Sequence, residues 1–451
     1  MTSQITFDQA LPLLISTLAD QAGADFAQSG VIVRDASGRL AFVSSRLAAS
    51  DLEIDALNAS VAEKLGGYAR QGGAIRFSDA PGAQAVLEAS DATPIRVEDH
   101  FYNLLDRRIV GSGWLNTPAT GVTNPPRFVF ATLKGGVGRS TALSVAAADL
   151  ARRGRNVLVI DLDLEAPGLG ELLLSEDRTP KYGVIDYLVD NGIVGIPGDR
   201  LGDFIGTSDL TTAEGGRVDV MPALGTTSEN YPENVLPKLS RAMTEDIDSN
   251  GVVTVDRQIS CMIDAVTQRD QYDVVLIDSR AGLSELAAPA VLGLGATVFF
   301  FGTAQRQTYQ GYRKLFAAFQ LLAQREKAAG GDAEWRSALR PVYAKASMNK
   351  DTIALFSEEV FELFSEYIYD EEDLSGGSGD ALRFTQDDMT APHQPLMIPF
   401  TPSFLDFDPL LRPGQLESDF YEQTYRPFLN KIDELIESSM TDHERPNDNH
   451  L

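Results

Sequence analysis

The sequence reads Lys134-Gly-Gly-Val-Gly-Arg-Ser-Thr141 between a strand-like run, Arg127-Phe-Val-Phe-Ala-Thr-Leu133, and a helix-like run that opens at Ser140. Three glycines at a strand-to-helix turn allow successive backbone N–H groups to converge on an anion with no side chain in the way. The N-terminus of the following helix adds partial positive charge at the same point. A glycine-rich loop that only turns the chain is the alternative interpretation, but the flanking strand and helix favour a phosphate cradle.

The pattern after residue 127 alternates between strand-like and helix-like segments. Continuous apolar runs such as Val157-Leu-Val-Ile160 and Val274-Val-Leu-Ile277 are typical of parallel strands that are buried on both faces. We expect strands at 127–133, 156–161, 217–222, 272–278, 296–302, 341–346 and 395–399, and helices that include 140–153 and 308–328. The predicted fold class is α/β, with a doubly wound, mainly parallel sheet whose ligands bind at the carboxyl ends of the strands.

The sequence predicts two domains joined by a linker, with an insertion in the second domain and a polar tail after it. Residues 1–105 are predicted to form a small α+β domain, with a hairpin of strands at 31–33 and 40–43, whose role the sequence does not reveal. A linker is expected at 106–126, followed by the nucleotide-binding domain at 127–440. We expect an acidic insertion at about 366–390 and a polar tail at 441–451.

The 451 residues are 43% hydrophobic and 23% charged, as in an ordinary globular protein. Cys261 is the only cysteine, so the chain forms no internal disulfide, which fits a cytoplasmic protein. The four histidines lie far apart in the sequence, and this spacing argues against a zinc site. Neither a membrane-spanning run nor a signal-peptide pattern is visible.

The net charge is −27, and the excess of acidic residues is largest in residues 351–451. Such a field opposes binding to DNA and to anionic lipid. The amphipathic segment 416–440 has an acidic polar face, which also disfavours membrane binding. DNA binding would depend on basic residues around the helix 308–328, for which a solvated helix face is an equally good explanation: Arg306, Arg313, Lys314, Arg325, Lys327, Arg336 and Arg340.

The phosphate loop supplies candidates for binding a nucleotide and its metal. Its backbone donors would come from Gly135, Gly136, Val137, Gly138, Arg139 and Ser140. The Ser140 hydroxyl is the candidate Mg²⁺ ligand, and Thr141 would lie near the α-phosphate. Arg139 stands where a P-loop usually has lysine, and its planar fork positions the charge differently. We expect nucleotide binding to survive this exchange. The rate of hydrolysis is the property that the exchange should affect.

Acidic residues follow two of the predicted strands. Asp161 ends one strand and Asp163 begins the next loop, while Asp278 follows four aliphatic residues. The second pattern is that of a Walker B acid, which holds Mg²⁺ through water. Helix capping is the alternative for the first pair. Arg280 either reaches phosphate or a partner subunit, or pairs with a nearby acid.

The stretch from Lys134 resembles the deviant Walker A sequence KGGxGK[ST] of the ParA/MinD family of dimerising P-loop ATPases, in the SIMIBI class, with Arg139 in place of the second lysine. The resemblance covers residue 127 to the C-terminal helix, and residues 1–126 and 351–395 fall outside it. It implies that Asp163 orients the attacking water and that Asp161 lies near the metal. It also implies that Lys134 crosses into the nucleotide of a partner subunit in an ATP-sandwich homodimer.

The resemblance further implies ATP and Mg²⁺ as cofactors, with base contacts at Asn349 and Pro399. The catalytic candidates are Lys134, Arg139, Asp163 and Asp278, and the metal candidates are Ser140, Asp161 and Asp278. We expect an ATP-dependent homodimerising switch with slow hydrolysis that controls a protein partner from the same operon, in partitioning, signalling or phage defence. Two alternatives stay open: a nucleotide-binding dimer scaffold that does not hydrolyse ATP, and a DNA-partitioning ATPase.

Overall fold

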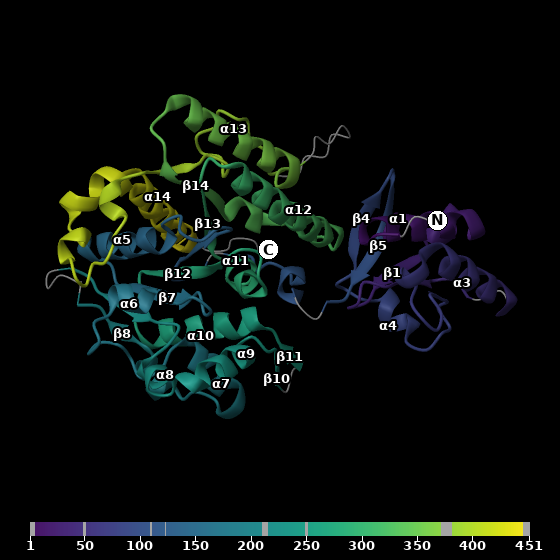
Figure 1. Cartoon of the computed structure of the whole chain (residues 1–451), viewed down its shortest axis with the longest axis horizontal. Helices are drawn as coiled ribbons and strands as arrows, with labels where there is room; N and C mark the ends of the chain where they lie inside the picture. The colour runs from purple at the N-terminus through teal and green to yellow at the C-terminus, as the bar shows by residue number, and fades with distance from the viewer. Residues whose placement is uncertain are drawn as a thin grey trace. The chain divides into compact units, whose positions relative to one another are not determined.

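The computed structural model describes residues 5–47, 51–108, 111–121, 123–209, 215–248, 251–370 and 381–444. The chain splits into two compact units, one of Met1–Leu115 with Ala318–Ala333 and one of Asn116–Ala317 with Glu334–Leu451. Residues 371–380 of the expected acidic insertion and 445–451 of the expected tail lie outside the described residues. Figure 1 shows the chain coloured from its N-terminus to its C-terminus.

The first unit contains a five-stranded sheet in the order β3-β2-β1-β5-β4. Its elements are α1 (Phe7–Ala22), α2 (Ala24–Ala27), β1 (Gly30–Arg34), β2 (Leu40–Ser44), α3 (Asp51–Leu65), β3 (Ile75–Arg76), α4 (Ala83–Leu87), β4 (Thr93–Val97) and β5 (His100–Asp106). β1 and β2 form the antiparallel hairpin that the sequence predicts. The sequence analysis missed β4 and β5, because β5 exposes Phe101 and buries both Leu104 and Leu105, which breaks the apolar alternation.

The second unit contains an eight-stranded sheet in the order β15-β14-β13-β6-β12-β7-β9-β8. Its strands are β6 (Arg127–Thr132), β7 (Val157–Leu162), β8 (Gly206–Thr207), β9 (Val218–Met221), β12 (Val274–Ala281), β13 (Thr297–Gly302), β14 (Leu339–Ala346) and β15 (Leu396–Pro399), beside a two-stranded ribbon of β10 (Asp246–Asp248) and β11 (Gly251–Val253). All the neighbours in the large sheet pair in parallel except β8 with β9. The predicted fold class is therefore confirmed, and each expected strand is present.

The helices of this unit follow its strands along the chain, and α14 comes after the last strand. They are α5 (Arg139–Arg152), α6 (Leu169–Leu173), α7 (Val184–Val194), α8 (Thr226–Asn230), α9 (Val235–Ala242), α10 (Val255–Arg269), α11 (Ala288–Leu292), α12 (Arg306–Ala328), α13 (Lys350–Tyr367) and α14 (Ser418–Glu444). The second half of α12 belongs to the first unit by its contacts. None of the described helices is both long and apolar enough to cross a membrane.

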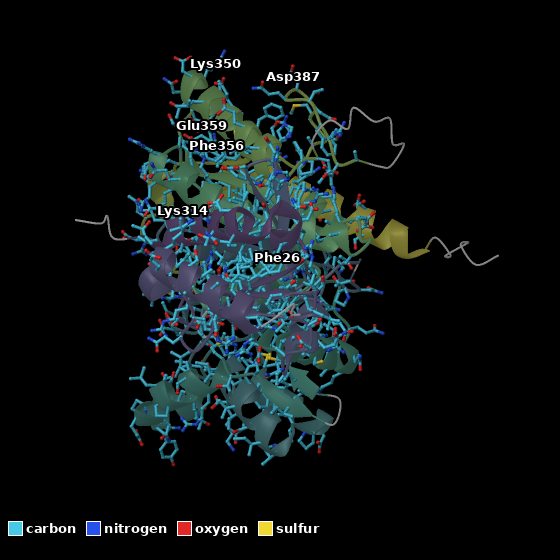
Figure 2. All side chains as sticks on the ribbon, turned by 90° about the vertical axis from the view of Figure 1, so that its right-hand side faces the viewer. Phe26, Lys314, Lys350, Phe356, Glu359 and Asp387 are labelled. Carbon is cyan, nitrogen blue, oxygen red and sulfur yellow. The ribbon has the colours of Figure 1, made fainter. Side chains whose placement is uncertain are left out.

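Alternating aromatic residues on β13 fix helices to both faces of the sheet. Phe299 and Phe301 contact Phe428 of α14, whereas Phe300 between them contacts Phe316 of α12. Successive side chains of a strand point to opposite faces, so one tripeptide anchors two layers. α13 is held in a similar way through Phe356, which stacks on Tyr343 of β14, and Figure 2 shows Phe356 and Lys350 along this helix.

Candidate nucleotide-binding site

The phosphate loop connects β6 to α5 at the carboxyl edge of the sheet, where parallel α/β folds bind ligands. Gly136 and Gly138 have φ angles of 76° and 92°, in the left-handed region that side chains with a Cβ disfavour. A Cβ on Gly136 would meet no atom within 4 Å. Backbone conformation, and not space, therefore requires glycine at this position.

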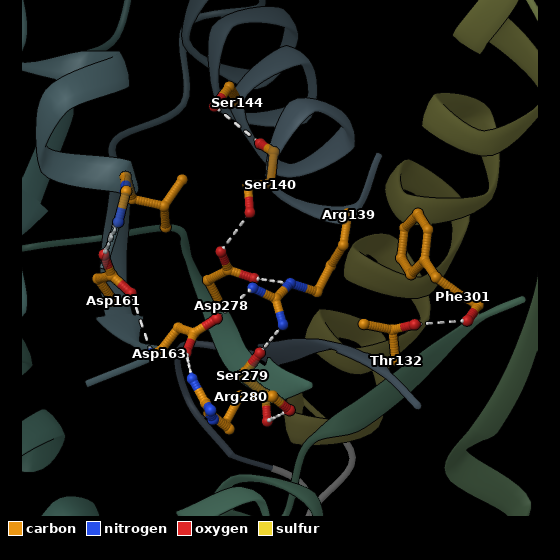
Figure 3. A network of polar contacts seen from close by, with 12 residues as sticks. Thr132, Arg139, Ser140, Ser144, Asp161, Asp163, Asp278, Ser279, Arg280 and Phe301 are labelled. Carbon is orange, nitrogen blue, oxygen red and sulfur yellow. Dashed lines mark hydrogen bonds and ion pairs between the residues drawn. The ribbon is translucent and has the colours of Figure 1, made fainter. Parts of the chain in front are cut away.

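Ser140 and Asp278 meet at the base of the loop, as Figure 3 shows. The Ser140 hydroxyl donates to Asp278 Oδ2 at 2.7 Å. Ser140 lies in the first turn of α5, and Asp278 lies in β12, the strand next to β6. Asp278 is 2% exposed, and burial raises its pKa although the charge of Arg139 acts in the opposite direction. The structure thus brings two of the three predicted metal ligands, Ser140 and Asp278, into direct contact.

The Arg139 side chain lies beside Asp278 and Asp163 (Figure 3). It forms ion pairs with Asp278 and with Asp163, whose Oδ2 accepts from Nη2 at 3.0 Å, and it donates to the Ser279 carbonyl. Burial disfavours the cation, but the charges of Asp278 and Asp163 outweigh it and raise the pKa of Arg139. Arg139 is therefore a buried cation that is already neutralised by carboxylates.

Asp163 is held from its other side by Arg280. Nη1 of Arg280 lies 3.2 Å from Asp163 Oδ1, and Nη2 lies 2.6 Å from Glu165 Oε2. Arg280 therefore pairs with nearby acids, which was one of the two roles left open for it. Each oxygen of Asp163 is engaged by a different arginine, so the loop after β7 and the end of β12 are tied together.

Asp161 organises the loop that carries Asp163. Its carboxylate accepts backbone hydrogen bonds from Asp163 at 3.0 Å and from Gly168 and Leu169 at 3.1 Å. Burial raises its pKa, and the charge of neighbouring Asp278 raises it further. Three N–H donors thus hold the Asp161 carboxylate in place, and its role as a metal ligand stays a prediction.

Lys134, at the start of the loop, is exposed. Its ammonium contacts Gln305 Oε1 at 3.3 Å and makes no ion pair with a described residue. The backbone N–H of Gly282, the residue after β12, donates to the Thr132 carbonyl of β6 at 2.8 Å. The phosphate loop and the loop that follows β12 therefore meet at the end of β6.

A cavity of about 230 Å³ opens beside the loop. Gly136, Val137, Gly138 and Thr141 line one side, and Pro399, Phe400, Thr401 and Tyr425 are among the residues opposite. Pro399, a predicted base contact, thus lines the cavity beside the phosphate loop. Asn349 is not among the lining residues, because it caps α13 and accepts from the N–H groups of Asp351 and Thr352.

Lys345 also lines this cavity, and the sequence analysis did not identify it. The rule that ligands gather at the carboxyl ends of parallel strands would have selected it, since Lys345 is the penultimate residue of β14. Tyr425 comes from α14, and nothing in the local sequence signals its position at the cavity.

Comparison with known proteins supports the assignment of this region. Residues 128–287 match the family described as the CobQ/CobB/MinD/ParA nucleotide binding domain. The match contains the phosphate loop and the residues Asp161, Asp163 and Asp278, and the predicted ParA/MinD-like class is confirmed for this part of the chain. The region is a nucleotide-binding domain of that class. A search of curated proteins found no match.

Several solved structures share weaker similarity with the chain. The MinD cell division ATPase of Pyrococcus furiosus is 18% identical, with 69% of this chain and 99% of that chain covered and a TM-score of 0.41. A plasmid partition protein from Borrelia burgdorferi is 16% identical, with coverages of 69% and 99% and a TM-score of 0.37. The MinD cell division protein of Aquifex aeolicus is 16% identical, with coverages of 68% and 97% and a TM-score of 0.39. Because these TM-scores are below 0.5, the assignment rests on the family match and the site geometry.

Proposed function

We propose that the protein is an ATP-dependent switch that binds Mg·ATP at the phosphate loop, forms a homodimer around the nucleotide and hydrolyses it slowly. One observation carries this proposal: the hydrogen bond of 2.7 Å between the Ser140 hydroxyl and Asp278. P-loop NTPases hold Mg²⁺ between a phosphate-loop hydroxyl and a Walker B aspartate. This contact places the same two groups together under the glycine-rich loop.

The residues around Asp278 fit a magnesium ion. Asp278 Oδ1 is buried and has no hydrogen-bond partner among the described residues, since its ion pair with Arg139 Nε lacks hydrogen-bond geometry. The described part of the chain contains no cluster of three or more His, Cys, Asp or Glu residues arranged for a metal. Ser140 and Asp278 would therefore hold Mg²⁺ together with phosphate oxygens and water, as is usual for this ion. Bound there, it supplies positive charge against the phosphate oxygens.

The two arginines on Asp163 indicate how the site prepares for hydrolysis. A guanidinium pairs bidentately with phosphate, so a bound triphosphate competes with Asp163 for Arg139. When Arg139 turns to the phosphate, Asp163 Oδ2 becomes free to accept a hydrogen bond from a water molecule. Arg280 still holds Oδ1 and keeps the carboxylate in place. Turnover is slow in this scheme, because a buried arginine must exchange its partners first.

The scaffold alternative follows from the same geometry. If Arg139 keeps its pairs with Asp163 and Asp278, the carboxylate stays unavailable to water and the bound nucleotide persists. Phosphate release from the wild type and from Asp163→Ala, measured with Mg·ATP, separates the two proposals. Release by the wild type that falls to background in the variant supports the hydrolysing switch. Tight nucleotide binding without release by the wild type supports the scaffold.

Lys134 provides the support for dimerisation. Its ammonium is exposed and makes no ion pair with a described residue, so it is available to a second subunit. Light scattering of the wild type and Lys134→Ala with a non-hydrolysable ATP analogue tests this step. We expect a doubled mass for the wild type alone. A monomeric wild type at saturating nucleotide contradicts the dimer.

A protein partner fits the organisation of the chain better than DNA does. The first unit has its own hydrophobic core, built around residues such as Leu14 and Phe42, and therefore suits a contact role. Arg325 and Arg336, two of the basic residues considered for DNA binding, are only 7% and 4% exposed. The DNA-partitioning alternative loses part of its basic surface for this reason. An ATP-dependent and salt-sensitive shift in the electrophoretic mobility of duplex DNA, caused by the protein, would support that alternative again.

A further inference from the structure

Lys345 sits at an irregularity in β14. The pairing of β14 with β15 shifts register between Ala344 and Ala346, which leaves Lys345 as the extra residue. Its φ angle is 50°, in the left-handed region that non-glycine residues rarely occupy. Bulges of this kind are frequent beside active sites, where they re-aim a side chain. Strained backbone conformations of this kind are concentrated at active sites and ligand-binding sites.

The Lys345 side chain crosses from β14 to the phosphate loop. Its ammonium donates to the carbonyl oxygen of Gly136 at 2.7 Å. Its stem passes close to Gly138, since a Cβ built on Gly138 would lie 4.0 Å from Lys345 Cε. The same residue lines the 230 Å³ cavity beside the loop. The bulge therefore directs one side chain across the edge of the nucleotide cavity.

The charge of Lys345 is also available to a ligand. The residue is exposed and forms no ion pair within the described part of the chain. An ammonium group has three donors, and the Gly136 carbonyl accepts from one of them. Arg139, in contrast, is already paired with Asp163 and Asp278. Lys345 thus places a positive charge beside the cradle that carboxylates do not neutralise.

We propose that Lys345 fastens the phosphate loop to β14 and sets the rate at which bound nucleotide leaves. The inference rests on the proposed function, because it assigns a further residue to the same nucleotide site. The stem forms part of the cavity wall, and the remaining donors serve ribose hydroxyl or phosphate oxygens. Lys345 is a positioning residue for the loop as well as a contact for the ligand.

Stopped-flow release of a fluorescent ATP analogue from the full-length protein, with Mg²⁺ and an excess of ATP as chase, tests the proposal. Lys345→Met keeps most of the stem and loses the charge, so release should accelerate about tenfold or more. Lys345→Arg restores the charge and should recover most of the slow release. Lys350→Met, which changes an exposed lysine at the outer end of α13 (Figure 2), is the matched control and should release at the wild-type rate.

Lys345→Gly separates this role from a structural one. Glycine accepts a φ of 50° without strain, so the thermal midpoint of the nucleotide-free variant should hold or rise while nucleotide release accelerates. A lower midpoint with unchanged release would mean that Lys345 only supports the fold, and would overturn the proposal. Unchanged release from Lys345→Met would overturn it as well. If the wild type itself fails to bind the analogue, the proposed function fails and the inference with it.

Discussion

Arg139 donates to Asp163 across 3.0 Å in a buried setting, so the cation expected at the phosphate and the carboxylate expected at the water neutralise each other. Neither residue could be free for its predicted task while this pair persists. The pair therefore makes hydrolysis depend on what competes for Arg139. A triphosphate is the natural competitor, because guanidinium groups bind phosphate and carboxylate in the same bidentate manner.

Replacing Arg139 by lysine should accelerate hydrolysis. A lysine carries a single compact charge and cannot hold Asp163, Asp278 and the Ser279 carbonyl together. We expect the single-turnover rate of phosphate release to rise about tenfold for Arg139→Lys. Arg152→Lys on the same helix, whose arginine donates to the Leu416 carbonyl, is the control and should leave the rate unchanged. A slower Arg139→Lys enzyme would show that the arginine assists the reaction.

Removal of the Ser140 hydroxyl should reduce the gain in ATP affinity that Mg²⁺ provides. Ser140→Ala loses the group that contacts Asp278, and we expect the Mg²⁺-dependent gain in ATP affinity to fall about tenfold. Binding measured in EDTA should barely change. Ser144→Ala removes a hydroxyl that donates to the Ser140 carbonyl within α5, and it serves as the control in calorimetric titrations. Equal losses with and without Mg²⁺ would contradict a role at the metal.

Arg280→Ala should affect turnover more than affinity. The variant releases Asp163 Oδ1 and Glu165, so the carboxylate loses its fixed orientation. We expect about tenfold slower single-turnover hydrolysis with ATP affinity within about threefold of the wild type. The loss of the pair with Glu165 should cost about 1 kcal/mol or less of stability, because the Glu165 side chain is 42% exposed. Arg178→Ala, which breaks an exposed pair with Asp209, is the matched control for denaturation and for rate.

Stability should depend on pH through Asp278. Burial raises its pKa to about 6 in the folded protein, from an ordinary value of 3.8. Between these values the folded state keeps a proton that the unfolded state releases, so stability rises as the pH falls from 7 towards 4. In Asp278→Asn this contribution disappears, and the slope of unfolding free energy against pH should be shallower by up to about 1.4 kcal/mol per pH unit. Urea titrations of both proteins at pH 7, 6 and 5 measure the difference, and parallel slopes would refute the assignment.

The phosphate loop and the acidic strand ends were predictable from the sequence because their signals are local. Continuous apolar runs indicated β7 and β12, and topology then required Asp161, Asp163 and Asp278 to lie at one sheet edge. The position of Pro399 at the cavity follows from the same rule. Asn349 illustrates its limit, because three residues beyond its strand the chain has already begun α13 and uses the amide as a cap.

The sequence by itself determined the α/β class and the loop that cradles an anion. The reason is that backbone freedom, helix dipoles and apolar periodicity depend on residues that are close together in the sequence. Only the tertiary structure decided which cation faces which anion. Arg139 reaches Asp163 across 24 positions, Arg280 reaches it across 117, and Lys345 reaches Gly136 across 209. Such pairings depend on distances in space, and the order of residues along the chain does not encode them locally.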